Sequence, residues 1–234
     1  MKKNKLVILI GPPGSGKGSQ ALLLADKKKM RHLEVSKLLE RRFLNAKEKE
    51  SIKIEEREYQ LKEQERRWRE GLLCEDAFVA KVVEENIEKL KDETEPILLD
   101  GYPRTKVQAS LAFSFLLSLY GKEGIFVIYL DIEEEESLKR NTGRRICSLM
   151  RHSIINIEET KDLTICPVDG SSLEKRIMDD PEKIKIRLKK FKEETVPAIE
   201  YMEEQGIKVI KIDGMGSISD VFFRVLKEVE DFGL

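Results

Sequence analysis

The sequence is short of cysteine, lacks long apolar runs and has no excess of either charge. Three cysteines in 234 residues are too few, and odd in number, for the disulfide framework of a secreted protein. No run approaches the roughly 18 apolar residues of a membrane-spanning helix. The basic start is followed by only a short apolar run, Leu6 to Ile10, which is too short for the core of a signal peptide. We therefore expect a cytoplasmic protein with no membrane partner.

Charge is abundant but balanced. Charged residues make up 37% of the chain, with 43 Lys and Arg against 44 Asp and Glu, for a formal net charge of −1. A protein that binds nucleic acid without regard to sequence needs an excess of basic charge over its footprint. The balance argues against a nucleic-acid partner, and mixed charges are typical of solvated helix faces.

Apolar runs alternate with amphipathic segments along the chain. The runs typical of strands buried on both faces cover residues 6–10, 97–99, 126–130 and 208–212, with a weaker fifth at 32–35. Charge-rich segments with helical periodicity lie between them, for example at 19–28, 76–90, 106–120 and 181–204. This alternation predicts an α/β fold: one domain built on a doubly wound, parallel, five-stranded sheet that binds ligands at the carboxyl ends of its strands.

Two segments interrupt the alternation. Residues 40–70 contain ten basic and nine acidic side chains, and Ile54, Leu61 and Trp68 recur every seven residues. We expect a solvated helical excursion there rather than a coiled coil, because the apolar stripe is far shorter than three to four heptads. Residues 147–176 are irregular with short β-like stretches, as expected of a flap rather than a core element.

A glycine-rich loop follows the first strand. It reads Gly11-Pro12-Pro13-Gly14-Ser15-Gly16-Lys17-Gly18-Ser19 and leads into a helix. Such a loop lets backbone N–H groups converge on phosphate oxygens at a helix N-terminus, with Lys17 reaching the β- and γ-phosphates. A tight turn without a ligand is one alternative, which the flanking strand and helix disfavour. A dinucleotide loop with Glu34 on a ribose is another, which Lys17 and Ser19 disfavour.

Three groups of residues resemble the adenylate kinases and their nucleoside monophosphate kinase relatives. The first is the end of the loop, Gly16-Lys17-Gly18-Ser19-Gln20. The second is Asp100-Gly101-Tyr102-Pro103-Arg104-Thr105, followed by Gln108 and Ala109. The third is a series of arginines that match, in order, those flanking the family's lid: Arg140, Arg144, Arg176 and Arg187.

The resemblance implies a single kinase domain of the P-loop NTPase type over residues 1–234. It implies a helical insertion at 32–76 that binds the acceptor and a lid insertion at 144–180. The implied reaction is ATP + AMP ⇌ 2 ADP, with Mg²⁺ as cofactor. We expect the enzyme to be a monomer. The alternatives are a kinase for a pyrimidine or another nucleoside monophosphate, and a nucleotide-binding module that has lost phosphoryl transfer.

The resemblance also assigns roles to residues. The implied catalytic residues are Lys17, Arg104, Arg140, Arg144, Arg176 and Arg187. Those implied to bind ATP are Gly14, Ser15, Gly16, Lys17, Gly18, Ser19, Arg140 and Arg144. Those implied to bind the acceptor are Val35, Ser36, Arg41, Gly101, Arg104, Gln108, Arg176 and Arg187. Ser19 and Asp100 would hold magnesium through water, since Mg²⁺ prefers oxygen ligands, and Arg104 is a fixed fork suited to phosphate.

The acceptor insertion departs from the family pattern. Val35 stands where the family has a threonine that helps to seat the base, and Glu40 where it has an arginine that binds the acceptor phosphate. Arg41 and Arg42 follow directly, so Arg41 is a candidate replacement. One step along a helix turns a side chain by about 100°, so the identity of the acceptor is the least determined part of the prediction.

The lid departs as well. Some relatives hold the lid with zinc, and the matching positions here are Cys147, Met150, Cys166 and Asp169. Zinc prefers thiolate, imidazole and carboxylate over the thioether of Met150. The sequence therefore leaves two alternatives open: a zinc site on Cys147, Cys166 and Asp169 with His152 as a fourth ligand, or a lid held by packing and hydrogen bonds.

Overall fold

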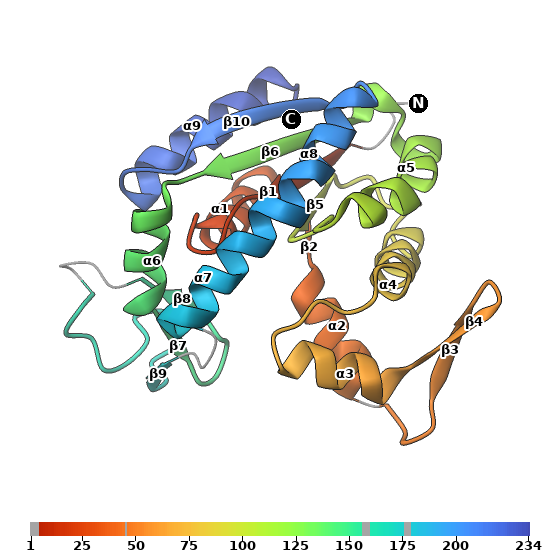
Figure 1. Ribbon diagram of the computed structural model, residues 1–234. Helices are drawn as coiled ribbons and strands as arrows, with labels where there is room; N and C mark the ends of the chain where they lie inside the picture. Colours follow the sequence, from red (N-terminus) through yellow and green to blue (C-terminus); the bar gives the residue numbers. More distant parts are fainter. Residues whose placement is uncertain (1–4, 45, 156–159, 176–178) are drawn as a thin grey trace.

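The computed structural model describes residues 5–44, 46–155, 160–175 and 179–234. Its centre is a five-stranded sheet in the order β10-β6-β1-β5-β2, with all neighbours parallel (Figure 1). The strands are β1 (Leu6–Ile10), β2 (Arg31–Glu34), β5 (Ile97–Asp100), β6 (Ile125–Asp131) and β10 (Lys208–Asp213). The predicted parallel sheet is confirmed. Its weak fifth strand lies one residue earlier than predicted, because Val35 begins a helix.

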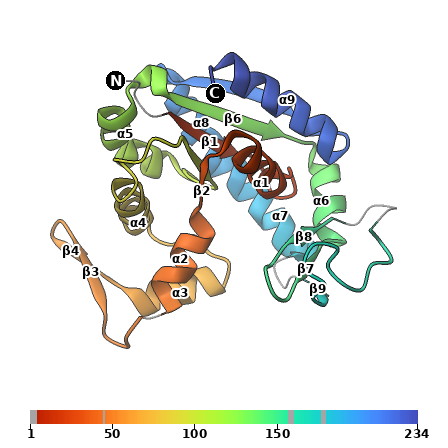
Figure 2. The ribbon, with the colours of Figure 1, turned by 180° about the vertical axis from the view of Figure 1, so that it is seen from behind.

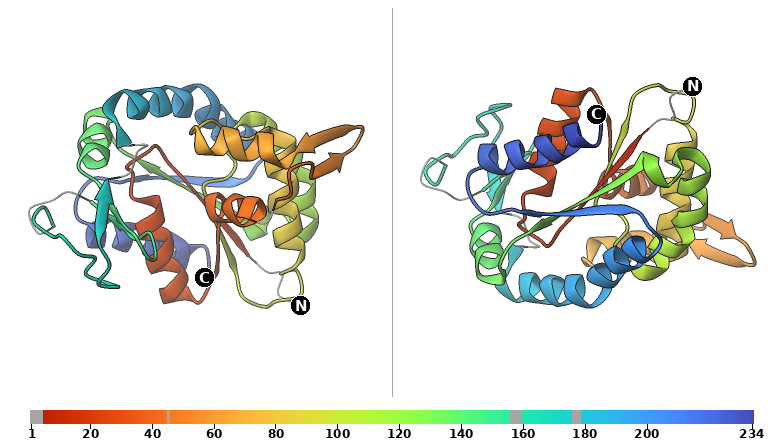
Figure 3. Two further views of the ribbon diagram at one scale, coloured as in Figure 1. Left: turned by 90° about the horizontal axis from the view of Figure 1, so that it is seen from below. Right: turned by 90° about the horizontal axis from the view of Figure 1, so that it is seen from above.

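Helices cover both faces of the sheet, as a doubly wound fold requires. Leu6 and Ile8 of β1 belong to a core with α4, α5 and α8, whereas Val7 and Leu9 face the core with α1 and α9. Figures 2 and 3 show α1 and α9 together on one side of the sheet and α8 on the other. The helices are α1 (Lys17–Lys28), α4 (Asp76–Glu88), α5 (Lys106–Tyr120), α8 (Val196–Glu204) and α9 (Ile218–Asp231). Among the described helices, none has the length and apolar content to cross a bilayer.

The long helix predicted over 181–204 is divided. α7 (Pro181–Lys190) and α8 are joined by a π-helical turn, Phe191–Thr195. Asp180 caps α7 by accepting from the backbone N–H groups of Glu182 and Lys183, as an N-cap aspartate does. π-turns are frequent at functional sites because they redirect the side chains that follow.

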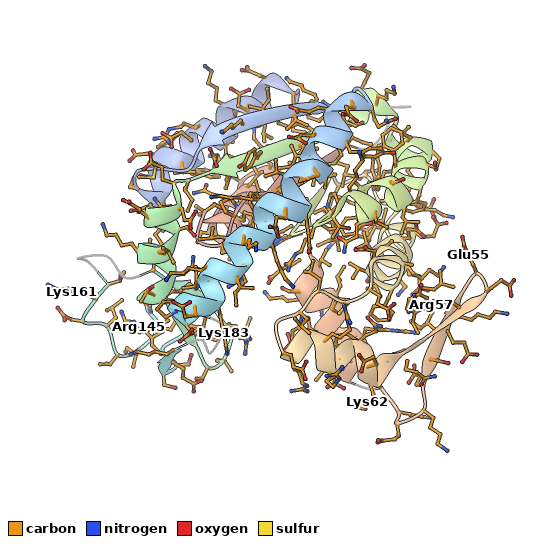
Figure 4. The ribbon with its side chains drawn as sticks, in the orientation of Figure 1. Glu55, Arg57, Lys62, Arg145, Lys161 and Lys183 are labelled. Atoms are coloured by element: carbon orange, nitrogen blue, oxygen red, sulfur yellow. The ribbon has the colours of Figure 1, made fainter. Side chains whose placement is uncertain are left out.

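The acceptor insertion contains a β-hairpin that the sequence did not predict. α2 (Val35–Leu44) and α3 (Leu61–Arg69) are helical as expected, but β3 (Ser51–Ile54) and β4 (Arg57–Gln60) pair antiparallel between them. The prediction of helix over residues 51–60 is therefore wrong. Apolar and charged residues alternate along these strands, and this alternation favours the hairpin. Ile52, Ile54 and Tyr59 pack inward while charged neighbours face solvent. Figure 4 shows Glu55 at the tip and Arg57 on the side facing α4, where it pairs with Glu75 at 2.5 Å.

The lid is a small antiparallel sheet, as its short β-like stretches predicted. β7 (Arg145–Cys147) lies between β8 (Ser153–Ile154) and β9 (Leu173–Lys175), and it follows α6 (Glu134–Thr142). Cys147, Ile154 and Cys166 form its buried centre. Arg145 donates to the carbonyls of Thr160 and Leu163 and so ties the lid loop to β7.

Candidate active site

The loop between β1 and α1 is shaped by its glycines. Gly14 and Gly16 have φ angles of 79° and 89°, in the left-handed region that glycine adopts without strain. A Cβ atom on Gly14 would lie 2.4 Å from Asn141 Nδ2, so the close approach of α6 also requires glycine. The loop therefore curves in front of the α1 N-terminus, where N–H groups of the first turn have no partner within the helix.

Lys17 bends back over this loop. Its Nζ donates to the carbonyl oxygens of Gly11 at 2.6 Å and Pro12 at 2.8 Å. Burial lowers the pKa of Lys17 to about 7; the Asp100 carboxylate opposes this shift and the Arg104 guanidinium adds to it. Because a desolvated cation among other cations is stabilised by an anion, the electrostatics favour a polyphosphate at the loop.

Asp100 ends β5 beside the loop and is buried. It is in register with Leu9 of β1 and Glu34 of β2, and His32 Nε2 lies 3.6 Å from its Oδ2. Ser19 projects from the first turn of α1. A carboxylate and a hydroxyl at the carboxyl edge of the sheet are the oxygen donors that suit hydrated Mg²⁺.

Arg104 is fixed by the turn that follows β5. Its Nε donates to Gly101 O at 2.9 Å, its backbone N–H donates to Gln108 Oε1 at 2.8 Å, and Thr195 Oγ1 donates to its carbonyl at 2.8 Å. Burial lowers the pKa of Arg104, and the negative charge of Asp100 opposes the shift. The turn thus orients a guanidinium whose two NH₂ groups have no hydrogen-bond acceptor within the described ranges and so remain for a ligand. The amide oxygen of Gln108 is used within the turn, so its NH₂ group is the one left for a base.

Two of the lid arginines share one carboxylate. Arg144 donates from Nε and Nη2 to the two oxygens of Asp179, at 2.8 and 2.6 Å. Arg187 Nη1 lies 3.8 Å from Asp179 Oδ1. Asp179 is buried, so it holds two positive side chains from the lid and from α7 close together. Arg176 lies outside the described residues.

Arg140 is held on α6. Its Nε pairs with Glu136 at 2.7 Å and its Nη1 donates to Gly214 O at 3.0 Å. Gly214 follows β10, so Arg140 joins α6 to the loop beyond the edge strand. This contact keeps the side chain at the mouth of the glycine-rich loop, since α6 packs against that loop through Ser137, whose Oγ donates to Pro13 O at 2.6 Å.

The loop, the β5 turn and α7 border one cleft with an empty volume of about 740 Å³. Four lining residues were assigned roles from the sequence: Lys17, Gly101, Arg104 and Arg187. Others were not assigned: Gly71, Leu73, Lys190, Glu194 and Thr195. The sequence contained a pattern that could have identified two of the unassigned residues. Lys190 and Glu194 follow Arg187 at spacings of three and four residues, so all three share a helix face. Gly71 and Leu73 carried no such signal.

The acceptor residues proposed on α2 are not among the residues that line this cleft. Val35 is buried in the core, and Ser36 Oγ donates to Glu34 Oε1 at 2.8 Å. Arg41 is exposed on the helix surface, and Arg42 is partly buried. The wall on this side of the cleft is formed instead by the segment between α3 and α4.

Four potential metal ligands converge in the lid. The ligand atoms of Cys147, His152, Cys166 and Asp169 all lie within 4.8 Å of one another. His152 Nδ1 is 3.6 and 3.5 Å from the two sulfur atoms and 3.2 Å from Asp169 Oδ2. Met150 is 59% exposed and takes no part. The set of two thiols, one imidazole and one carboxylate fits tetrahedral zinc.

Comparison with known proteins gives consistent matches along the chain. The family model described as adenylate kinase matches residues 9–207. The chain is 32% identical to an adenylate kinase of Methanothrix thermoacetophila over 228 residues, which is 97% of this chain and 99% of that protein. It is 34% identical to an adenylate kinase of Caldanaerobacter subterraneus subsp. tengcongensis, covering 94% of each. It is 30% identical to an adenylate kinase of Mycoplasma capricolum, covering 96% of this chain and 99% of that protein.

Proposed function

The chain belongs to the adenylate kinase family, and we propose that it transfers the γ-phosphoryl group of ATP to AMP, giving two molecules of ADP. The observation that carries this proposal is the convergence of Lys17, Arg104 and Arg187 on one cleft. Their charges come from three separate elements, and a polyphosphate between them relieves their mutual repulsion. The names of the relatives favour AMP over other acceptors.

Transfer is direct and in line between two bound nucleotides. Lys17 and the backbone N–H groups of the loop hold the β- and γ-phosphates of ATP, and Arg104 holds the acceptor phosphate. The attacking oxygen belongs to an ionised phosphate, so the reaction requires no general base. Rate enhancement comes from positioning and from charge neutralisation by fixed cations.

Mg²⁺ supplies neutralisation of the β- and γ-phosphate oxygens when bound. Asp100 and Ser19 fit its water shell, since both are oxygen donors beside the loop. The effect of Asp100 on the pKa of Lys17 supports its closeness to the phosphate position.

Arg140, Arg144 and Arg187 act from the lid side. Asp179 pairs Arg144 with Arg187, so that both guanidinium groups are presented together to a nucleotide. Closure of the lid on ATP brings these charges onto the transferred phosphoryl group and excludes water. Arg176 is assigned to the same group of arginines through the resemblance alone.

A coupled assay with ATP and a panel of acceptors tests the proposal. AMP is expected to give the highest kcat/KM, with dAMP, CMP, UMP and GMP lower. Preference for a pyrimidine monophosphate would change the acceptor but keep the reaction. Tight ATP binding without transfer to any of the five would refute the kinase assignment.

We propose further that Cys147, His152, Cys166 and Asp169 bind one zinc ion that stiffens the lid. The support is the donor set and its closeness, because structural zinc sites contribute directly to folding. Protein purified without added zinc is expected to contain close to one zinc per chain, and Cys166→Ser is expected to lose it. Cys74→Ser is the matched control, since Cys74 is buried in the main core. A zinc content near zero in the wild type contradicts the site.

We also propose that the enzyme acts as a monomer in the cytoplasm and binds no nucleic acid. Balanced net charge supports the absence of a nucleic-acid footprint. None of the three cysteines, all of which lie in the described residues, is joined in a disulfide, which supports a reducing compartment. Light scattering at several protein concentrations tests the oligomeric state, and a concentration-dependent mass contradicts it.

A further inference from the structure

The acceptor side of the cleft needs a positive charge that α2 does not bring to it. A phosphate that approaches the γ-phosphate is itself an anion, so its binding requires cations on both sides of the transfer point. Arg104 supplies one charge from the β5 turn. Position 40 is Glu40, and Arg41, which is exposed on α2, is not among the residues that line the cleft.

The wall opposite the glycine-rich loop is built by the segment that follows α3. Gly71 and Leu73, which line the cleft, lie in the segment that joins α3 to α4. Figures 1 and 2 show this segment leaving α3 at the end that faces α7. Gln64, almost fully buried, fastens the segment by donating to Glu75 Oε1 at 2.8 Å and accepting from Glu75 N at 2.9 Å. The C-terminal turn of α3 is thus fixed beside the cleft.

Arg67 contacts the cleft wall through Leu73, although Arg67 itself, like Arg41, is not among the residues that line the cleft. Its Nε donates to Leu73 O at 3.0 Å, and among the described residues neither NH₂ group of the guanidinium has a hydrogen-bond acceptor, so both are left for a ligand. Burial raises the pKa of the Cys74 thiol to about 11, and the charges of Arg67 and Arg104 both oppose that rise. Arg67 and Arg104 therefore both lie within electrostatic range of Cys74, the residue that follows Leu73 of the wall.

The other basic side chains of β4 and α3 pair with carboxylates. The pairs are Arg57 with Glu75, Lys62 with Glu65, Arg66 with Glu63 and Glu70, and Arg69 with Glu65. Arg67 forms no ion pair with any carboxylate in the part of the chain that the structure describes. The positive charge of Arg67 contributes to the lowered pKa of Glu63, one turn earlier, but the hydrogen bonds of Glu63 are with Arg66.

We propose that Arg67 binds the phosphate of the nucleoside monophosphate together with Arg104, in place of an arginine from α2. The inference rests on the proposed function, because it assigns a residue to the acceptor of that reaction. A guanidinium tethered through Nε presents its two NH₂ groups as a fork, the geometry that suits two phosphate oxygens.

The test compares Arg67→Gln with the matched control Arg66→Gln on the same helix. Glutamine can still donate to Leu73 O but carries no charge. In Arg67→Gln we expect the KM for AMP to rise about 10- to 100-fold, as for loss of a charged hydrogen bond, while the KM for ATP changes less than about twofold. Arg66→Gln is expected to match the wild type, and Arg67→Lys to fall between. If Arg67→Gln does not fold, Arg67→Lys carries the same comparison.

Binding of adenosine and AMP separates a phosphate contact from support of the wall. Calorimetry on Arg67→Gln should show weaker AMP binding and unchanged adenosine binding. Equal weakening of both ligands, an unchanged KM for AMP, or an effect found in Arg42→Gln instead of Arg67→Gln overturns the inference and leaves the kinase assignment intact. A wild-type enzyme that is inactive with every monophosphate of the panel refutes the proposed function, and the inference with it.

Discussion

Lys17 provides a quantitative test of the electrostatics of the empty cleft. With a pKa of about 7, its side chain is about nine-tenths neutral at pH 8 in the absence of nucleotide. Phosphate oxygens beside Nζ favour the charged form and restore a pKa near the ordinary value for lysine. Binding of ATP at pH 8 should therefore take up about 0.9 proton at this residue, and about 0.1 proton at pH 6.

Calorimetry measures this uptake directly. The observed enthalpy of ATP binding is plotted against the ionisation enthalpy of several buffers, and the slope is the number of protons taken up. Lys17→Met, titrated to saturation, provides the background from ATP itself, so the difference between the two proteins isolates Lys17. A difference below about 0.3 proton at pH 8 would refute the lowered pKa.

The same shift predicts how the stability of the empty protein depends on pH. The folded-state pKa of Lys17 lies below its unfolded value of 10.5, so the unfolded chain binds more protons between about pH 7 and pH 10.5 and stability rises with pH in that window. Lys17→Met lacks this pH-dependent contribution to the free energy of unfolding. Because Lys17 is partly exposed, we reduce the full effect and expect the wild type to gain about 2 kcal/mol relative to the variant from pH 7 to pH 10. Urea unfolding of the empty proteins measures it, and a pH-independent difference contradicts it.

Three further changes test the lid and the acceptor insertion. Asp179→Asn removes the carboxylate that pairs two arginines, so kcat/KM for ATP should fall about 10- to 100-fold in steady-state assays; an unchanged value argues against the pairing. Leu61→Ala, at a side chain with 0% exposure, should cost about 2–4 kcal/mol in chemical unfolding. The 74% exposed Leu44 is the control, and Leu44→Ala should cost less than about 0.5 kcal/mol. His152→Ala should lower zinc content and the thermal midpoint, whereas Met150→Ala should change neither; the reverse result would place the methionine in the site.

The central sheet could be predicted because its determinants are contiguous in the sequence. A strand buried on both faces needs an unbroken apolar run, and residues 6–10 and 97–99 meet that requirement without reference to any distant partner. The loop before Lys17 and the turn before Arg104 follow these strands directly. Parallel pairing then brings the two segments to the same edge, so the core of the site follows from the fold class.

The hairpin and the π-turn could not be predicted, because both depend on tertiary contacts. Charges dominate residues 51–60, and the alternation of Ile52, Ile54 and Tyr59 is short enough to be compatible with a helix. Packing of these side chains against the main core favours the strand form. Residues 181–204 have continuous helical periodicity, which does not indicate the π-turn at Phe191–Thr195. The last residue of that turn, Thr195, donates to the carbonyl of Arg104, a contact between segments far apart in the sequence.

Two kinds of charged pair explain why a nearly neutral chain forms a basic cleft. In α3, acids and bases alternate at helical spacing, as in Lys62 with Glu65 and Arg69 with Glu65. Such pairs follow from local sequence, stabilise by only a few tenths of a kcal/mol each and leave little net charge.

In the cleft, by contrast, Lys17, Arg104 and Arg187 come from different elements, and the buried carboxylates among them are Asp100 and Asp179. No local pattern pairs these cations, so their charges add where the parallel strands end. The lowered pKa of Lys17 follows first from its burial, and the charges of the neighbouring guanidinium groups add to it. The lowered pKa of Lys17 destabilises the empty protein, and a bound phosphate anion reverses this destabilisation. The same arrangement of cations therefore weakens the empty cleft and strengthens nucleotide binding.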